Sequence, residues 1–304
     1  MIILLSVFKV LLPMLYLVTW AGYLWVFLSD HPIPRRWCSR MAAVTVVIHI
    51  ISSIVRGIVL GRLPMGAPLE FSSLLAESLL LTYLLIEGRW RVKQTGFLVV
   101  GVAFVLQFVA SAFSTTAPAA SPLLRDPGFA GHAVLVLLAY VAMSLSFIYA
   151  VLYLVQSRQL ARKSFGLLFR RLPPLDVLEK MSVGAVELGV PLLFGSLVLG
   201  HLRMYSLWDH VEPDMVAQLS PWDPKIMVSW AIFLAYVVGW IGHKLRGWRG
   251  RRMSILAVVA YVTLISAMGF VHHFLPSFHD FRSTRNSILE VDAKQSRGAL
   301  DVRG

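Results

Sequence analysis

The sequence is poor in charged residues and nearly free of cysteine. Asp, Glu, Lys and Arg make up only 14% of its 304 residues, against about 25% in an average soluble domain. Hydrophobic residues make up 57%, and the mean hydropathy is +0.72. The single cysteine, Cys38, excludes a disulfide within the chain and a catalytic thiol pair. This composition excludes an ordinary soluble domain and indicates a membrane protein.

Long apolar stretches recur along the chain, and a helix needs about 20 such residues to cross a bilayer. The stretches lack the alternation of barrel strands, so helices are the expected structure. The first stretch is too long and too aromatic for a cleaved signal peptide. We therefore predict an all-α, polytopic bundle of about eight membrane helices, at residues 3–28, 41–60, 69–87, 96–115, 131–155, 182–202, 226–243 and 253–275. They form one domain, residues 1–279, followed by a polar tail, residues 280–304.

Basic residues gather in alternate connections between these stretches. Connections 29–40, 88–95, 156–181 and 244–252 hold 17 of the 28 lysines and arginines. Basic loops stay on the cytoplasmic side, so this pattern predicts that both termini lie outside. These basic loops account for the pI of about 10.2, so the high pI does not indicate a nucleic-acid partner. We predict an integral protein of a bacterial cytoplasmic (inner) membrane, or of a thylakoid membrane in a plastid.

Four of the nine histidines fall into two layers on this topology. His49 lies in the second predicted helix, about 12 Å from its cytoplasmic end at 1.5 Å per residue, and His243 ends the seventh helix on that side. His132 begins the fifth helix and His279 follows the eighth, both at the outer face. Facing imidazoles across a bundle are what axial ligation of a haem iron requires. For each histidine, a packing or interface role is the open alternative.

Arg56 follows His49 by seven residues and so shares its helix face. Its guanidinium could pair with a haem propionate, or with Glu77 in an intramembrane ion pair. Both interpretations stay open on the sequence alone.

The outer connection 203–225 carries two tryptophans, Trp208 and Trp222, each followed by an aspartate (Asp209 and Asp223). Indole faces can stack on a flat, apolar macrocycle. Tryptophan is also common in the interfacial belt of any membrane protein. The sequence contains no thiol pair, phosphate loop or H-E-x-x-H motif, and we predict no catalytic residue.

Several motifs resemble the cytochrome c assembly family, the haem-handling proteins of the CcsA/ResC type that are related to CcmC, CcmF and HemX. The most specific stretch, residues 222–252, reads WDPK and continues through Trp230, Tyr236 and His243 to GWRGRR. Further similar segments are GRLPMGAPLEFSSLL at 61–75, RRLPPLDVLEKMSVGAVELGVPLLFGSLVLG at 170–200 and LPSFHDF at 275–281. The resemblance spans nearly the whole chain. The tryptophan loop is longer and poorer in aromatics than the family pattern, and Ala67 replaces the usual asparagine.

The resemblance implies that haem b is carried as cargo. By family position, the inner axial ligands are His49 and His243, and the outer ligands are His132 and His279. Trp208, Trp222 and Asp223 would present the haem to apocytochrome c with its C-x-x-C-H motif. A membrane partner subunit with a large outer domain is also implied.

The resulting hypothesis is a subunit that transports and presents haem in c-type cytochrome biogenesis, either as a component of a cytochrome c haem lyase or as a haem carrier without its own catalytic nucleophile. A first alternative is a divergent HemX-like scaffold for a haem-pathway enzyme or another complex. A second is an electron-transfer subunit that holds b-type haem permanently.

Overall fold

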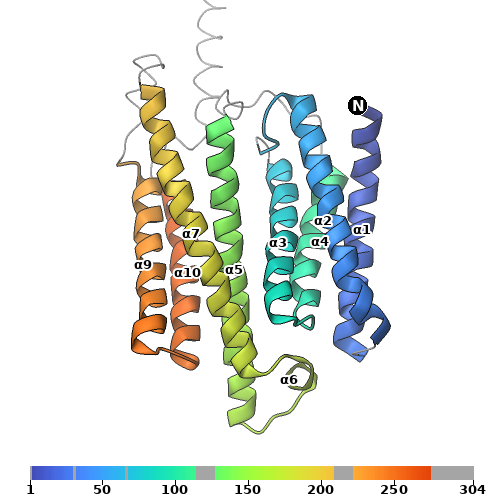
Figure 1. The fold of residues 1–304 in the computed structure, drawn as a ribbon, viewed down its shortest axis with the longest axis vertical. Helices are drawn as coiled ribbons and strands as arrows, with labels where there is room; N and C mark the ends of the chain where they lie inside the picture. The colour runs from blue at the N-terminus through green and yellow to red at the C-terminus, as the bar shows by residue number, and fades with distance from the viewer. Residues whose placement is uncertain (1, 30–31, 66–67, 114–126, 209–221, 275–304) are drawn as a thin grey trace, which may run out of the picture.

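The computed structural model describes residues 2–29, 32–65, 68–113, 127–208 and 222–274 (Figure 1). Within these ranges the chain is entirely helical apart from turns and loops. The elements are α1 (Ile2–Ser29), α2 (Pro32–Leu60), α3 (Pro68–Trp90), α4 (Gly96–Phe113), α5 (Pro127–Ala161), α6 (Leu167–Arg171), α7 (Leu175–Trp208), α9 (Pro224–Arg246) and α10 (Arg251–Phe274). All of these except the short α6 are long and apolar enough to cross a membrane. This confirms the predicted all-α membrane bundle.

Several helices run beyond the predicted spans into the basic connections. α2 begins at Pro32 rather than near residue 41, and α5 continues to Ala161 rather than ending near 155. Lysine and arginine stems extend along apolar surface while their charged ends reach water, so a helix can leave the membrane without breaking. The short α6 was not predicted, because five residues carry no hydropathy signal.

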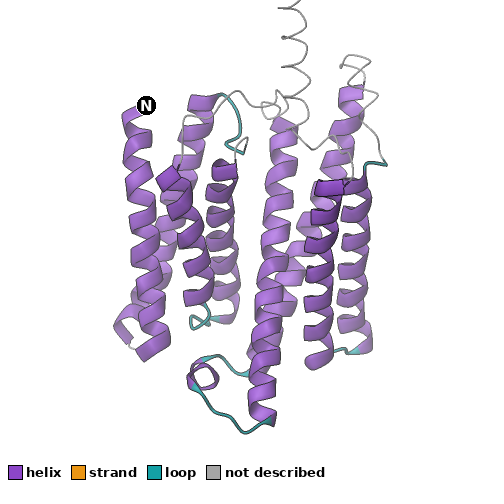
Figure 2. Ribbon diagram, turned by 180° about the vertical axis from the view of Figure 1, so that it is seen from behind, coloured by secondary structure: helices purple, strands orange, loops and turns teal. Residues whose placement is uncertain are grey.

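The long helices form two groups of four. In the first group, α1 packs on α2 and α4, and α3 packs on the same two helices. In the second group, α5 packs on α7 and α10, and α9 packs on the same two helices. α3 also contacts α5 and α7, which joins the groups. The views from front and back place α1–α4 on one side and α9 and α10 on the other (Figures 1 and 2).

Aromatic rings and small residues fill the interior, while large apolar side chains cover the outside. The first core is built around Tyr16, Tyr23, Tyr83 and Tyr149, all fully buried. Gly184 of α7 allows the indole of Trp90 to lie directly on the helix, because a Cβ there would overlap the ring. This contact presses the end of α3 against α7. Exposed leucines, isoleucines and valines are the surface expected of a protein solvated by lipid.

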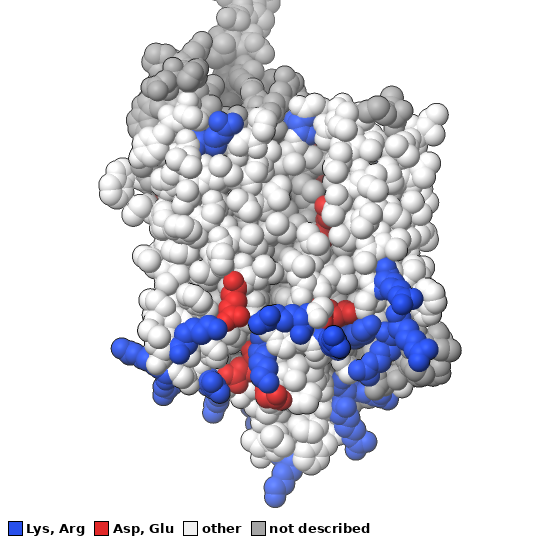
Figure 3. Space-filling view, viewed as in Figure 1, with Lys and Arg blue, Asp and Glu red and all other residues white. Residues whose placement is uncertain are grey.

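Charge is strongly sorted along the length of the bundle. Lysine and arginine crowd the end where α1 meets α2, α3 meets α4 and α9 meets α10 (Figures 1 and 3). The α1 N-terminus lies at the opposite end (Figure 1). We call these the basic end and the distal end. That the basic end faces the cytoplasm, with both termini outside, stays a prediction.

Candidate functional site

His132 lies near the distal end, in the second turn of α5. Its Nδ1–H donates a 2.7 Å hydrogen bond to the Ser196 carbonyl of α7. The ring rests against α7 at Gly200, where a Cβ would stand only 2.9 Å from Nδ1 and Cε1. A carbonyl can only accept, so Nδ1 carries the proton and Nε2 is the nitrogen able to ligate a metal. Metal-binding histidines commonly show this second-nitrogen anchor.

His243 repeats this arrangement at the basic end. It lies in the last turn of α9, and its Nδ1–H donates to the Trp248 carbonyl at 2.8 Å. The turn forms because Gly247 adopts a left-handed φ of 65° and caps the helix, which suits glycine. The indole of Trp248 then folds over Gly242, where a Cβ would collide with it. His243 therefore also presents Nε2.

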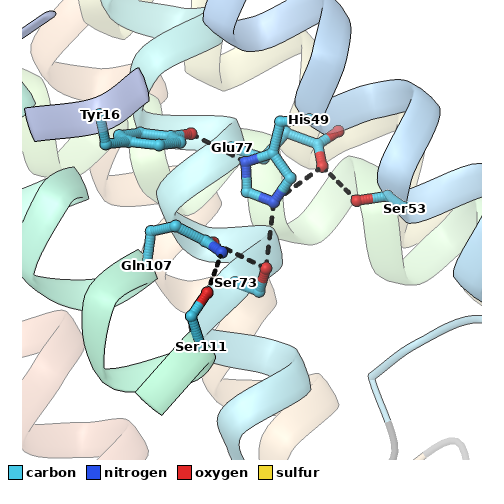
Figure 4. A network of polar contacts seen from close by, with 7 residues as sticks. All are labelled: Tyr16, His49, Ser53, Ser73, Glu77, Gln107 and Ser111. Atoms are coloured by element: carbon cyan, nitrogen blue, oxygen red, sulfur yellow. Dashed lines mark hydrogen bonds and ion pairs between the residues drawn. The ribbon is translucent and has the colours of Figure 1, made fainter. Parts of the chain in front are cut away.

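His49 has a different environment inside the α1–α4 group (Figure 4). It is only 1% exposed, and both ring nitrogens are engaged. Ser73 donates to Gln107 Oε1 at 2.8 Å, so Ser73 must accept from His49 Nε2–H at 3.0 Å. Nδ1 then accepts from the Tyr16 hydroxyl at 2.9 Å. An iron ligand would have to displace one of these partners.

The structure does not bring His49 and His243 together. Their helices, α2 and α9, belong to different groups on opposite sides of the molecule (Figure 1). His49 also lies farther from the beginning of its helix than the sequence predicted. Since α2 begins at Pro32, His49 lies about 26 Å along it and about 17 Å before Leu60, at 1.5 Å per residue. His279, the predicted partner of His132, lies outside the described residues.

Arg56 pairs with Glu70 rather than with Glu77. Its Nη2 lies 3.7 Å from Glu70 Oε1, and the same carboxylate accepts from Arg62 at 2.9 and 3.3 Å. Glu77 instead accepts from Ser53 at 2.5 Å and lies 3.7 Å from His49 Nε2. Antiparallel packing of α2 and α3 explains this pairing, since a seven-residue step up α2 from His49 to Arg56 matches the step down α3 from Glu77 to Glu70.

The predicted tryptophan loop is described only in part. Trp208 ends α7, but its side chain lies outside the described residues. Trp222 is 76% exposed. Asp223 is 5% exposed and is the N-cap of α9, accepting from the Lys225 amide at 2.8 Å with Pro224 next in the chain. The WDPK motif thus sets the start of α9. Asp223 followed by Pro224 is a capping signal that could have been recognised in the sequence.

Two further side chains join the distal end of the second group. His201 of α7 donates from Nδ1 to the carbonyl of Leu197, at 2.7 Å, and its ring meets Trp230 of α9 edge-on with centroids 5.8 Å apart. Arg203, two residues on, lies against Gly128 at the start of α5. No signal in the sequence predicts the helix rotation that turns His201 toward α9. In the α1–α4 group, Gln107 is an amide within an otherwise apolar span. That signal could have identified it as a member of a buried polar network.

Comparison with known proteins places this architecture in a family. Residues 10–277 match the sequence profile of the cytochrome c assembly protein family. Protein HemX of Brevibacillus brevis is 30% identical over 183 residues, which cover 59% of this chain and 63% of HemX. Inner membrane protein YpjD of Escherichia coli K12 is 26% identical over 177 residues, covering 58% of this chain and 63% of YpjD. Cytochrome c biogenesis protein CcsA of Synechococcus elongatus is 33% identical over 89 residues, covering 28% of this chain and 24% of CcsA.

The matched regions thus span less than two thirds of each of these relatives. The profile match nevertheless extends from α1 to just beyond α10, so it includes both groups of helices. It also includes His132, His201 and His243, the three histidines that anchor one ring nitrogen on a backbone carbonyl. This chain belongs to the cytochrome c assembly protein family.

Proposed function

We propose that this chain is a haem-binding membrane subunit of c-type cytochrome biogenesis that carries haem b as cargo. The cargo site is the distal end of the second group, where α5 begins, α7 ends and α9 begins. Family membership and the CcsA relative support the role in cytochrome c biogenesis. The binding site itself is inferred from the geometry of His132.

The observation that carries the proposal is the anchoring of His132 to α7. The hydrogen bond to Ser196 fixes both the ring plane and the tautomer, so Nε2 is the unprotonated nitrogen that would ligate iron. Trp230 offers an aromatic surface on α9, and Arg203 offers a cation suited to a propionate. His279 is proposed as the opposite axial ligand from its place in the sequence.

His243 is proposed as the first contact for haem at the basic end, because its anchor has the same form. His49 is left out of this ligand set, since hydroxyl groups engage both of its nitrogens. From the distal site, haem would pass to the C-x-x-C-H cysteines of an apocytochrome, assisted by a partner subunit. The described side chains hold and orient the cargo.

A second candidate function is a scaffold like HemX, acting beside a haem-pathway enzyme. The matches to HemX and YpjD cover 59% and 58% of this chain, against 28% for CcsA. A scaffold would keep the helices but would not release haem to an apocytochrome. A permanent b-haem electron carrier would bind haem and also fail to release it.

The test is the absorption spectrum and haem content of the purified protein, followed by haem transfer to an apocytochrome c peptide. We expect low-spin b-type haem that is lost in His132→Ala, retained in His49→Gln and passed to the peptide. Protein that stays haem-free after incubation with haem would favour the scaffold. Haem that binds but cannot be transferred would favour the electron carrier.

A further inference from the structure

A cavity of about 390 Å³ opens among the four helices of the first group, in a different part of the bundle from the proposed haem site. It lies between the first turns of α1 and α3 and the last turns of α2 and α4, toward the distal end. Its walls are mainly apolar and include Phe8, Leu12, Leu74 and Ala110. Small-molecule sites have volumes of about 300–1,000 Å³, so this cavity is large enough for a compact guest.

The charged residues that line the cavity are already engaged with other groups. Arg56 and Glu70 form an ion pair at 3.7 Å, and Glu70 also accepts from Arg62 at 2.9 Å. Lys9, the third charged residue of the lining, has an interaction of its own. Inside a membrane span, a charged guest is costly unless an opposite charge is free to pair with it. The described charged groups therefore favour a neutral guest.

Three buried polar side chains in the cavity wall still have hydrogens to donate. Gln107 donates one amide hydrogen to Ser111 at 3.0 Å, and its Oε1 accepts from Ser73 at 2.8 Å (Figure 4). Among the described residues, neither the second amide hydrogen of Gln107 nor the hydroxyl hydrogen of Ser111 has an acceptor. Ser52 of α2 makes no hydrogen bond within the same part of the chain. Gln107 is 3% exposed, and Ser52 and Ser111 are each 8% exposed.

These donors define the polar end of the guest. A buried donor without an acceptor costs free energy, so the guest should supply acceptor oxygens. A carbonyl oxygen has two lone pairs and no charge. A hydroxyl group on the guest would instead add another hydrogen to a wall that already has hydrogens in excess. The wall therefore favours a guest with carbonyl oxygens and without donors.

We propose that this cavity binds a neutral, lipid-soluble molecule through its carbonyl oxygens. These oxygens accept from Ser111 and Gln107 on α4 and from Ser52 on α2. The apolar remainder of the guest lies against Leu12 of α1. A fatty acyl ester and a quinone ring both have this chemistry. The site is in a different helix group from His132 and does not depend on haem binding.

Binding of tritiated 2-undecanone tests the proposal, with the full chain in nanodiscs of diether phosphatidylcholine, a lipid without carbonyl groups. Ligand retained above the background of empty nanodiscs should saturate at about one per chain. At equal mole fraction in the bilayer, unlabelled 2-undecanone should displace it at least about tenfold more effectively than undecane. The reason is that two hydrogen bonds of ordinary strength together amount to about one tenfold step in affinity.

Serine variants test the donors directly. Ser111→Ala and Ser52→Ala should each weaken binding by about 3–10-fold, because each removes one hydrogen bond to the guest. The infrared carbonyl stretch of bound 2-undecanone should also move to higher frequency in these variants. Ser78→Ala is the matched control and should bind normally, since Ser78 is 7% exposed in the same helix group but does not line the cavity.

Four results would overturn the proposal. Equal displacement by undecane would remove the role of the carbonyl, and normal binding in both Ser111→Ala and Ser52→Ala would remove the role of the donors. Stronger displacement by decanoate would require a charged guest. Displacement by haem would make the cavity part of the haem path.

Two further measurements sharpen the assignment. Methyl decanoate and 2,3-dimethyl-1,4-naphthoquinone should both displace the ketone, and the more effective of the two identifies an ester or a quinone as the natural class of guest. His132→Ala separates this proposal from the proposed function, because that variant should lose haem while binding the ketone normally.

Discussion

In the α1–α4 group, His49 is 1% exposed and both of its ring nitrogens meet hydroxyl side chains. In the group of α5, α7, α9 and α10, His132, His201 and His243 each anchor Nδ1 on a backbone carbonyl. Side-chain partners on both sides use the whole hydrogen-bonding capacity of an imidazole. A backbone anchor on Nδ1 orients the ring and leaves Nε2 as the unprotonated nitrogen, which is the form that binds a metal. The same residue type is therefore structural in one group and suited to ligation in the other.

Further buried polar side chains of the α1–α4 group, between His49 and the basic end, also bond to other side chains. From His49 toward the basic end, the next such contact joins the hydroxyl oxygens of Thr19 and Thr45, which lie 3.0 Å apart. Nearer still to the basic end, Glu87 accepts from the Tyr23 hydroxyl at 2.5 Å and from the Ser39 hydroxyl. Such networks hold helices in register when all members are satisfied. We infer that the first group is a rigid support and that haem chemistry belongs to the second.

The largest expected effect is on the free energy of unfolding, compared for variants of two glutamates, one from each helix group. Glu87 is 4% exposed, with Tyr23, Ser39 and Lys93 around it. Glu187 is partly exposed and pairs with Lys244 at 2.7 Å. Glu87→Leu should lower the free energy of unfolding by about 3–5 kcal/mol, because it strands a buried network. Glu187→Leu should cost less than about 1 kcal/mol, as exposed pairs do.

Thermal and SDS-induced unfolding in detergent would measure both values. Lys93→Met is the companion variant, since it removes the cation but leaves the hydroxyl bonds to Glu87. Equal losses for the two glutamates would contradict the view that the first group is the more tightly specified.

Gly200 offers a direct test of the His132 anchor. A Cβ at this position would lie 2.9 Å from the imidazole, so Gly200→Ala should push the ring away from Ser196. Loss of an outer-sphere anchor typically costs about 10–100-fold in metal affinity, and haem affinity should fall by a similar factor. Haem titration followed by absorbance would measure it.

Gly195→Ala is the matched control on the same helix, because its Cβ would meet Leu135 at an ordinary 3.9 Å. Haem affinity should be unchanged in that variant. Equal affinity in the Gly200 and Gly195 variants would show that the Ser196 hydrogen bond does not position the ligand.

His49→Leu should act on stability and not on haem. The substitution keeps the apolar packing but leaves the Tyr16 hydroxyl and Ser73 without their imidazole partner. Stranding the buried Tyr16 donor and the Ser73 acceptor should cost about 2 kcal/mol. Adding Tyr16→Phe should recover part of the loss, because it removes one stranded hydroxyl. Loss of haem in His49→Leu with unchanged unfolding would return His49 to the ligand set.

The sequence predicted the eight membrane helices because each carries its own hydropathy signal, and it located His132 and His243 at helix ends. It could not predict which side chains meet across helices. The distance of His49 from the beginning of its helix depended on nine residues of α2, which the prediction left out because their charged side chains lower the hydropathy. The partner of Arg56 depended on the level at which α3 packs against α2. Helix order in space and rotation about each helix axis are tertiary properties. They decide whether the ring nitrogens of a histidine bond to side chains inside the bundle, as in His49, or to a backbone carbonyl, as in His132 and His243.

The smallest expected effect is the coupling energy between two hydroxyl groups, compared for one pair in each helix group. Thr19 and Thr45 each donate to a carbonyl of their own helix, at Leu15 and Met41. Their two hydrogens are thus already committed, and the 3.0 Å contact between them competes with these bonds. A double-mutant cycle with valine should give a coupling no larger than about 0.6 kcal/mol, the average for polar contacts between membrane helices.

Ser146 and Ser182, which join α5 to α7, provide the comparison for this cycle. Ser182 donates across to the Ser146 carbonyl at 3.0 Å, so the Ser146 hydroxyl can donate to Ser182 Oγ at 3.0 Å. Both hydrogens of this pair can therefore act between helices, and its alanine cycle should show the larger coupling. A larger coupling for the threonines would mean that their hydrogens leave the backbone carbonyls, and that the first group gains its rigidity from bonds between helices at this level too.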